Sequence, residues 1–418
     1  MRVLFITAYF PPCQYGWGYM RICEQVADGL AARGHDVAVL TSTYQDGPET
    51  KPYPVYRLLT VEPDWLLPES PARQFFFGRR EREKTAVTAL HQTIATFNPD
   101  MLFIWDAFGL SEVMLYQAEN QPIPVAYYFA NYHPEFPGGY AQYWSSENSQ
   151  PLVKLAKLPL ALLAKAILTA EGKPLKLTYE HTISVSDYVR QRLLGQKLIG
   201  PDAIVAPNAV DLTMFNGTPR QPAPDASLRC LLAGRVAPEK GIHTVLHAMG
   251  QLHEKGQLRD MSLTVLGSGT AEYKEHLKQL VIRYGLESFT NFAAPVPIKA
   301  MPTVLAEHDL LLLPSEWDEP LSCSMLEAMS AGLLVIGTTR GGSGEALFHG
   351  KTGLTFADGN PAALAQQLLA VIENRDLVAQ LARAGQAEVH AHFNMDVSVA
   401  RIETYLQELV GVETAVPR

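Results

Sequence analysis

The stretch from Asp309 to Glu345 constrains the fold of this chain more than any other part of the sequence. The apolar run Asp309–Leu313 is typical of a buried strand. After a polar turn, a helix is expected over Pro320–Ala331, because proline fits the first helical position. Gly332 would end that helix, and Leu333–Ile336 would form the next strand. The stretch therefore predicts a strand–helix–strand unit of the kind that builds parallel sheets.

The same alternation of short apolar runs and helical patterns recurs along most of the chain. Near the start, the loop Tyr9–Gly18 separates a strand from an amphipathic helix, and such a loop commonly faces a ligand phosphate in an open α/β sheet. Strands are expected at Arg2–Ala8, Asp36–Leu40, Val55–Val61, Met101–Trp105, Pro124–Phe129, His181–Val185, Leu228–Ala233, Leu263–Leu266, Thr290–Ala293, Leu310–Leu313 and Leu333–Ile336. The sequence therefore predicts an α/β protein with two doubly wound parallel sheets.

A segment rich in proline, Thr218–Ala226, separates two such runs of strands and helices. We therefore expect an N-terminal domain over residues 1–217, a linker over 218–226 and a C-terminal domain over 227–395. The last residues, 396–418, are expected to form a closing helix.

Two carboxylates, Glu319 and Glu327, bracket the helix predicted in the 309–345 stretch. On a continuous helix, eight residues correspond to ~12 Å along the axis. That separation exceeds the ~5–9.5 Å between the paired carboxylates of glycoside hydrolases. It suits two contacts on one elongated ligand, whose phosphate would meet the free N–H groups at the start of the helix. The alternative is an amphipathic core helix with two incidental acids.

Two cations follow the first strand of the C-terminal domain, in the segment Gly234–Gly241. Arg235 offers a planar fork of donors, and Lys240 offers a mobile point charge. Together they could hold an anionic group such as a phosphate. The alternative is a solvated loop that carries two cations.

These segments resemble the glycosyltransferase 4 family, whose members are retaining enzymes of the GT-B fold. The family motifs stand here as Gly234–Gly241, Glu319–Pro320, Glu327–Gly332 and Gly341–Glu345. The resemblance implies two Rossmann-like domains that face each other across a cleft, with the last helix crossing back to the first domain. It also implies transfer of a hexose from a nucleoside diphosphate sugar, such as a UDP or GDP sugar, to an acceptor hydroxyl with retention of configuration. The acceptor could be a glycan, a lipid-linked molecule or a small molecule.

The resemblance further implies roles for individual residues. Arg235 and Lys240 would hold the diphosphate. Glu327 would accept hydrogen bonds from ribose hydroxyls, and Glu319 would accept hydrogen bonds from hydroxyls of the donor sugar. With His133, residues Glu319, Arg235 and Lys240 form the expected catalytic set. The other expected donor contacts are Gly16, Gly18, Gly234, Gly267, Val296, Pro320, Leu321 and Ser322.

Three residues of the N-terminal half are candidates for the acceptor side. Asp106 follows one predicted strand, and Asn131 and His133 follow the next. Relatives carry a histidine near this place, close to the reacting sugar, although the register here is shifted. A loop histidine bonded to the backbone is the alternative for His133.

Composition limits the partners and the cofactors. A net charge of −9 gives no electrostatic case for nucleic acid. The four scattered cysteines are typical of reduced thiols in a cytoplasmic protein, and the apolar start of the chain is predicted to be a strand rather than a signal peptide. No Asp-x-Asp motif occurs, so we expect no metal and no cofactor beyond the sugar nucleotide as co-substrate.

Two stretches combine basic and apolar residues, Arg73–Arg80 and Lys154–Lys165. Such segments can bind an anionic lipid surface, so peripheral contact with a membrane is one interpretation. The other is a helix packed on the N-terminal sheet with its lysines in water. The oligomeric state is left open.

Two other functions compete with transfer. Gly16–Arg21 partly matches a dinucleotide fingerprint, which would suit a nicotinamide-dependent oxidoreductase, but Arg21 replaces its third glycine. That function leaves Arg235, Lys240, Glu319 and Glu327 unexplained. The third function is a catalytically silent subunit that binds sugar nucleotides.

Overall fold

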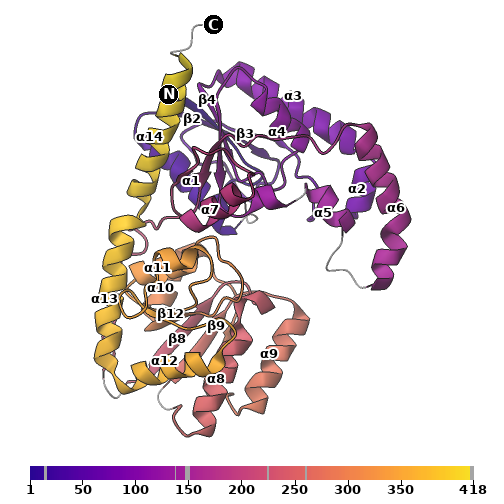
Figure 1. Ribbon diagram of the computed structural model, residues 1–418. Helices are drawn as coiled ribbons and strands as arrows, with labels where there is room; N and C mark the ends of the chain where they lie inside the picture. Colours follow the sequence, from indigo (N-terminus) through magenta and orange to yellow (C-terminus); the bar gives the residue numbers. More distant parts are fainter. Residues whose placement is uncertain (14–16, 137, 146–150, 224–225, 259–260, 415–418) are drawn as a thin grey trace. The chain divides into compact units, whose positions relative to one another are not determined.

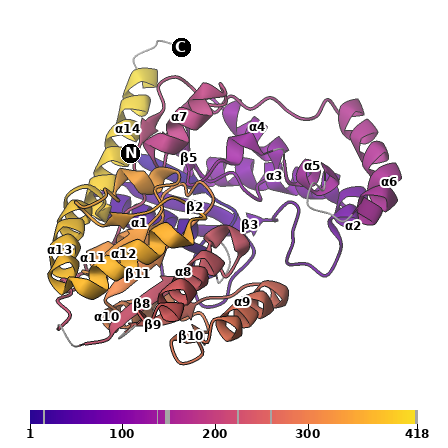
Figure 2. The ribbon, with the colours of Figure 1, turned by 60° about the horizontal axis from the view of Figure 1, so that its bottom comes forward.

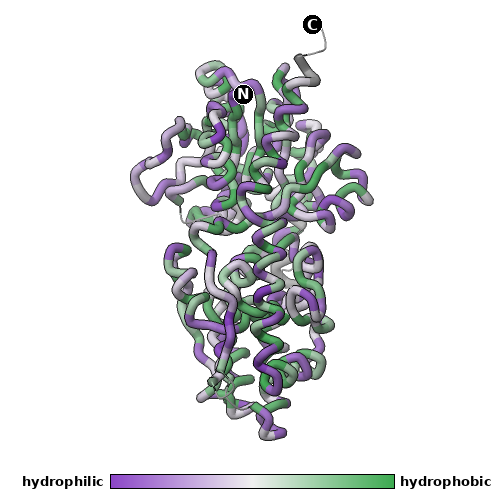
Figure 3. Tube along the Cα trace, turned by 90° about the vertical axis from the view of Figure 1, so that its left-hand side faces the viewer, coloured by the Kyte–Doolittle hydropathy of each residue, from purple (hydrophilic) through white to green (hydrophobic). Residues whose placement is uncertain are grey.

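The computed structural model describes residues 1–13, 17–136, 138–145, 151–223, 226–258 and 261–414. The chain forms two compact units, each with its own sheet. Unit 1 comprises residues 1–185, 189–206 and 399–418, and unit 2 comprises residues 186–188 and 207–398. Hydrophobic stretches run through the interior of each unit (Figure 3). The predicted class, α/β with two parallel sheets, is confirmed.

Unit 1 is built on a seven-stranded sheet in the order β3-β2-β1-β4-β5-β6-β7, in which all the paired strands are parallel (Figure 1). Its central strand β4 is buried at every residue, which explains an unbroken apolar sequence. The strands are β1 (Arg2–Ile6), β2 (Asp36–Ser42), β3 (Val55–Leu59), β4 (Met101–Trp105), β5 (Val125–Phe129), β6 (His181–Ser184) and β7 (Ile204–Val205). The helices are α1 (Trp17–Ala32), α2 (Pro71–Phe76), α3 (Arg79–Phe97), α4 (Glu112–Glu119), η1 (His133–Glu135), α5 (Gly139–Ser145), α6 (Pro151–Ala170) and α7 (Asp187–Gly195), whose last residues belong to this unit.

Unit 2 is built on a six-stranded sheet in the order β10-β9-β8-β11-β12-β13, again with parallel pairs (Figure 2). The strands are β8 (Leu228–Ala233), β9 (Met261–Leu266), β10 (Thr290–Ala293), β11 (Leu310–Leu313), β12 (Leu334–Gly337) and β13 (Leu354–Thr355). The helices are η2 (Pro238–Lys240), α8 (Ile242–Glu254), α9 (Ala271–Arg283), η3 (Ile298–Ala300), α10 (Met301–Ala306), α11 (Cys323–Ser330), η4 (Gly342–Glu345), α12 (Pro361–Glu373) and α13 (Arg375–His392). Helices α8, α9, α12 and α13 bury apolar side chains against the sheet in one continuous core.

The segment before the predicted linker lies with unit 2, so the units divide at residue 206 rather than at 217. The backbone N–H of Gly217 donates to Ser330, and that of Arg220 donates to Gly332 at 2.8 Å. These bonds hold the chain after Ala206 against the end of α11. A sequence-based boundary drawn at the prolines therefore falls too late.

The last helix, α14 (Met395–Thr414), connects unit 2 to unit 1. In unit 1 its Glu403 carboxylate lies 2.9 Å from Arg33 and 2.7 Å from His35. Val399 packs against Gly29 of α1, where a Cβ would come within 2.8 Å of it. Within the described ranges, none of the helices has both the length and the apolar character needed to span a bilayer.

Candidate functional site

Unit 2 gathers its predicted site residues on three loops that leave the carboxyl ends of strands. We call residues 234–241, 314–322 and 341–345 the donor loops. They follow β8, β11 and β12, and the carboxyl ends of parallel strands meet at one edge of a sheet, where ligands bind in α/β folds. Backbone hydrogen bonds join the loops. The N–H of Glu316 donates to the carbonyl of Glu239 at 2.9 Å, and the N–H of Gly342 donates to the carbonyl of Glu319 at 2.7 Å. The three loops therefore form one connected surface.

Glu319 and Lys240 come together on this surface. The Nζ of Lys240 lies 2.5 Å from Oε1 of Glu319, whose side chain is only 6% exposed. The hydroxyl of Ser315 donates to the same oxygen at 2.5 Å. The Lys240 ammonium also lies 5.2 Å from the centre of the Trp317 ring. The arrangement places a buried carboxylate beside a partly exposed cation, a pair that can bind both hydroxyl and phosphate groups.

The predicted start of the α11 helix at Pro320 is wrong, because the helix begins at Cys323. Ser322 is the N-cap, and its side chain accepts from the N–H of Met325. The backbone of Glu319 cannot join the helix because it pairs with Gly341 in a parallel bridge. Pro320 and Leu321 thus lie in a turn, and the ~12 Å axial offset between Glu319 and Glu327, which assumed a continuous helix, does not hold.

Two backbone contacts fix the end of α11 and the approach to it. At the end, Leu333 donates to Ala328 at 2.9 Å and Gly332 donates to Met329 at 3.0 Å. This pair of bonds forms a Schellman motif, with Gly332 at φ +81°, as the sequence predicted. At the start, the side chain of Asn208 donates to the carbonyl of Leu321 at 3.0 Å. Glu327 itself is buried in the second turn of α11.

Glycines of the donor loops and of the loop after β9 allow backbones to touch. Gly267 has φ +157°, and a Cβ there would lie 1.8 Å from the carbonyl oxygen of Gly234. Gly341 has φ +66°, and a Cβ there would lie 2.1 Å from the carbonyl oxygen of Glu319. Both positions therefore need glycine.

The remaining predicted donor contacts are more dispersed. Arg235 is about half exposed and pairs with Glu239 at 3.0 Å. Val296 is half-buried in the segment after β10. Gly18 lies in the first turn of α1 rather than in a loop, because that helix already begins at Trp17. Gly16 lies outside the described residues.

Sequence reasoning missed three residues of this site. Ser315 donates to Glu319, Trp317 lies beside Lys240, and Asn208 holds the turn before α11. Ser315 and Trp317 follow a buried strand, which is a signal for a ligand-facing loop. Asn208 lies more than a hundred positions from Leu321, and only tertiary structure brings the two together.

Unit 1 brings together two of its three predicted acceptor-side residues. Asn131 donates from Nδ2 to Oδ2 of Asp106 at 2.7 Å. Asp106 has φ +50°, which is unusual for a residue with a side chain and is often found at functional sites. Burial raises the pKa of Asp106 to about 7, and burial lowers the pKa of His133 to about 4. His133 is therefore neutral at neutral pH, and Asp106 titrates there.

We expect Asp106→Asn to remove a pH dependence of stability. The folded-state pKa of about 7 lies above the unfolded value of about 3.9. The wild-type free energy of unfolding should therefore fall as pH rises from about 4 through about 7. At alkaline pH the variant should be more stable than wild type by roughly 1–4 kcal/mol. Urea unfolding at acidic and alkaline pH measures this difference, with Asp202→Asn as an exposed control. A wild-type stability that rises over this range relative to the variant would contradict the expectation.

Metal ligands do not cluster in the part of the chain that the structure describes: no three histidine, cysteine or acidic side chains gather around one point. Of the two predicted cations, Lys240 lies beside the buried Glu319, whereas Arg235 pairs with Glu239. The independence from metal expected from the sequence stays a prediction.

Two family models match the chain. Residues 18–214 match the model described as Glycosyltransferase Family 4, and residues 219–388 match the one described as Glycosyl transferases group 1. Glycogen synthase of Mycobacterium tuberculosis is 24% identical over all of this chain and 97% of its own length. The chain spans less than half the length of several other curated relatives that it matches.

Solved structures give the same fold. Sucrose-phosphate synthase from Thermosynechococcus elongatus matches with a TM-score of 0.71 and 18% identity, covering 98% of this chain and 99% of that one. HepE from Anabaena, in complex with UDP and glucose, matches with a TM-score of 0.68 and 17% identity, covering 98% and 100%. The two family matches meet near the division between the units, and together with this fold they identify the chain as a GT-B glycosyltransferase of the family 4 and group 1 type.

Proposed function

We propose that this protein transfers a hexosyl group from a nucleoside diphosphate sugar to an acceptor hydroxyl with retention of configuration. The observation that carries the proposal is the contact between Lys240 and the buried Glu319 on the donor loops. A sugar nucleotide presents hydroxyls next to a diphosphate. A carboxylate that accepts hydrogen bonds from the hydroxyls, beside a cation that binds the diphosphate, suits such a ligand.

In the proposed reaction, the bond between the anomeric carbon and the diphosphate oxygen breaks as the acceptor oxygen bonds to the same face of that carbon. The acceptor proton passes to the leaving phosphate oxygen. Arg235 and Lys240 stabilise the charge that grows on the diphosphate. Glu319 accepts hydrogen bonds from hydroxyls of the sugar, and Glu327 accepts hydrogen bonds from hydroxyls of the ribose. In unit 1, Asp106, Asn131 and His133 are proposed to contact the acceptor.

The comparisons support a sugar nucleotide as the donor. HepE was solved with UDP and glucose, and again with UDP-glucose. Another relative is named as a GDP-mannose-dependent mannosyltransferase. A UDP or GDP sugar is therefore the proposed donor class for this chain, and a cytoplasmic site of action with peripheral membrane contact stays a prediction.

The competing oxidoreductase gains no support from the family matches, and the Gly16 part of its fingerprint lies outside the described residues. A silent subunit would share the donor loops, so only turnover separates it from an enzyme.

The proposal is tested by binding and turnover on the full chain. Calorimetry with UDP, GDP, ADP and NAD should show binding of a nucleoside diphosphate and none of NAD. The sugar nucleotide carrying the base that binds should then be hydrolysed or transferred, and EDTA should leave that rate unchanged because Arg235 and Lys240 supply the charge. Binding without turnover would identify a silent subunit. Loss of turnover in EDTA that Mg²⁺ restores would contradict the proposed role of the cations.

A further inference from the structure

The outward side of α6 is apolar. Four of its leucines, Leu158, Leu160, Leu162 and Leu163, are between 45% and 60% exposed, whereas Ala164 is fully buried. The helix packs against α5 and lies beside α2 and α5 in two views of unit 1 (Figures 1 and 2). A helix that faces only water is expected to present polar residues on that side. The leucines do not pack on the sheet of unit 1, so that interpretation of the sequence is wrong for them.

Other exposed apolar residues belong to the segment 65–77, which includes α2. Of the fourteen large hydrophobic side chains that are exposed in the described residues, eight fall within 65–77 and 158–163. The ring of Tyr143 in α5 links the two segments, because it lies 6.0 Å from the ring of Trp65 and 4.2 Å from the Nζ of Lys157. We call this group the α6 face: Trp65, Leu66, Leu67, Phe77, Leu158, Leu160, Leu162 and Leu163. A patch of this kind on a folded domain marks an interaction surface.

The charge of α6 is opposite in sign to that of the whole chain. Its twenty residues include three lysines and no acidic residue, in a protein with a net charge of −9. Lys165 is exposed, and Lys157 is half-buried over Tyr143. Leucines between lysines, with tryptophan and tyrosine beside them, are the composition of helices that lie in the interface of anionic bilayers.

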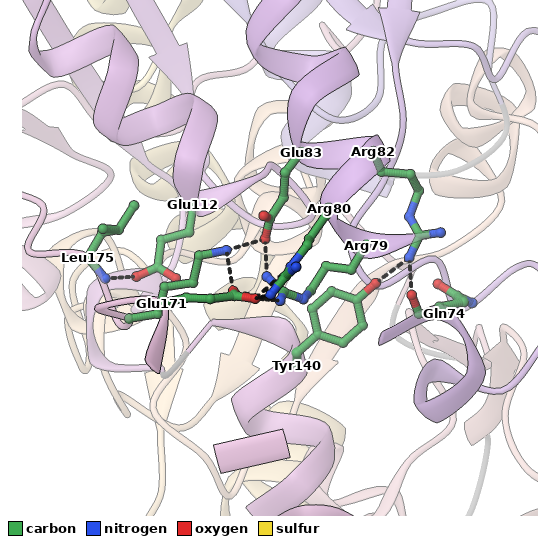
Figure 4. Close-up of polar contacts among 10 residues, drawn as sticks. Gln74, Arg79, Arg80, Arg82, Glu83, Glu112, Tyr140, Glu171 and Leu175 are labelled. Atoms are coloured by element: carbon green, nitrogen blue, oxygen red, sulfur yellow. Dashed lines mark hydrogen bonds and ion pairs between the residues drawn. The ribbon is translucent and has the colours of Figure 1, made fainter. Parts of the chain in front are cut away.

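An ionic network fixes the end of α6 to α3. Arg79 and Arg80 both donate to the Glu171 carboxylate, at 2.6 Å and 2.8 Å (Figure 4). Lys173 pairs with Glu83, which also accepts from Arg79 at 2.6 Å. Arg79 is only 3% exposed and stacks over the Phe75 ring at 4.9 Å. The network thus holds α6 in a defined position while its leucines face away from the core.

We propose that the α6 face binds the surface of an anionic lipid bilayer. The leucines and aromatic rings enter the boundary between headgroups and acyl chains, and Lys157 and Lys165 contact the anionic headgroups. A second copy of the chain is the less suitable occupant. In a two-fold interface the same patch would meet itself, and the lysines of one α6 would face those of the other. The proposal does not rest on sugar transfer, because binding to lipid needs no donor.

Vesicle flotation of the full chain tests the proposal. Wild-type protein should float with vesicles of equal parts phosphatidylcholine and phosphatidylglycerol, and should bind far less to pure phosphatidylcholine or at about 1 M salt. The double variant Leu162→Gln/Leu163→Gln should bind the anionic vesicles about tenfold more weakly. Lys165→Gln should weaken binding about fivefold. Ile282→Gln removes an equally exposed apolar side chain from unit 2 and is the matched control.

Three outcomes would overturn the proposal. The first is wild-type protein that does not float with anionic vesicles. The second is a double leucine variant that binds as tightly as Ile282→Gln. The third is self-association of the wild type without lipid, seen by size-exclusion chromatography and abolished in the double leucine variant, which would assign the face to a second copy. None of these results would change nucleoside diphosphate binding, so they leave the proposed transfer reaction to be judged separately.

Discussion

Glu319→Gln should slow sugar transfer about ten- to a hundredfold and leave the affinity for free nucleoside diphosphate nearly unchanged. Glutamine keeps the shape of the side chain but loses the charge that would accept sugar hydroxyls. A hydrogen bond to a charged group is worth roughly 1.5–3 kcal/mol, which corresponds to that loss of rate. Because the Glu319 carboxylate is buried and already ordered by Ser315, it is positioned to act on the sugar without rearrangement. Initial rates with a sugar nucleotide, together with calorimetry of the free diphosphate, measure the two effects.

Glu327→Ala is the matched comparison. Glu327 belongs to α11, whereas Glu319 lies in the turn before this helix, and the proposed ligand of Glu327 is the ribose. Both the free nucleotide and the sugar nucleotide contain the ribose, so this variant should bind both about ten- to a hundredfold more weakly. The division of roles fails if Glu319→Gln weakens free nucleotide as much as Glu327→Ala does. If both variants unfold, the two acids are structural.

Removing the two cations should have different consequences. Arg235→Ala should weaken diphosphate binding roughly ten- to a hundredfold and leave the fold intact, because Arg235 is about half exposed and pairs only with Glu239 among the contacts described. Lys240→Ala should lose similar affinity and also destabilise unit 2, since it leaves the buried Glu319 carboxylate without its ammonium partner. An unpaired buried charge costs about 1–3 kcal/mol or more.

A double variant separates these two effects of Lys240. Lys240→Ala/Glu319→Gln removes the stranded charge, so its thermal unfolding temperature should recover toward wild type while diphosphate affinity stays low. Calorimetric titration and thermal unfolding of the single and double variants provide the measurements. Diphosphate affinity that is unchanged in both Arg235→Ala and Lys240→Ala would refute the assignment of the cations.

The elements of the fold could be predicted wherever burial alone decides them. β4 and β11 have the predicted bounds because each is a fully buried apolar run that follows an aspartate. The two-residue strands β7 and β13 could not be predicted, since so short an element has no periodicity of its own.

The candidate site was predictable in its residue types and less so in its geometry. The sequence pointed to Lys240 and Glu319 separately. The two residues are 79 positions apart, and their contact depends on how their two loops pack together. The start of α11 was misplaced for the same reason. Local propensity favours a helix from Pro320, whereas the bridge between Glu319 and Gly341 is a tertiary interaction that holds the backbone extended. In unit 1, nothing local signals the bond between Asp106 and Asn131.

The path of α14 has a consequence for how the protein is made. Unit 2 is almost continuous in sequence, whereas unit 1 combines residues that precede unit 2 with residues from Val399 onward that follow it. Val399, Ile402 and Leu406 are nearly fully buried in unit 1, and the ribosome synthesises them after unit 2. The earlier part of unit 1 therefore cannot bury its apolar surface beside α1 until unit 2 has been synthesised. This surface stays open while all of unit 2 is being translated.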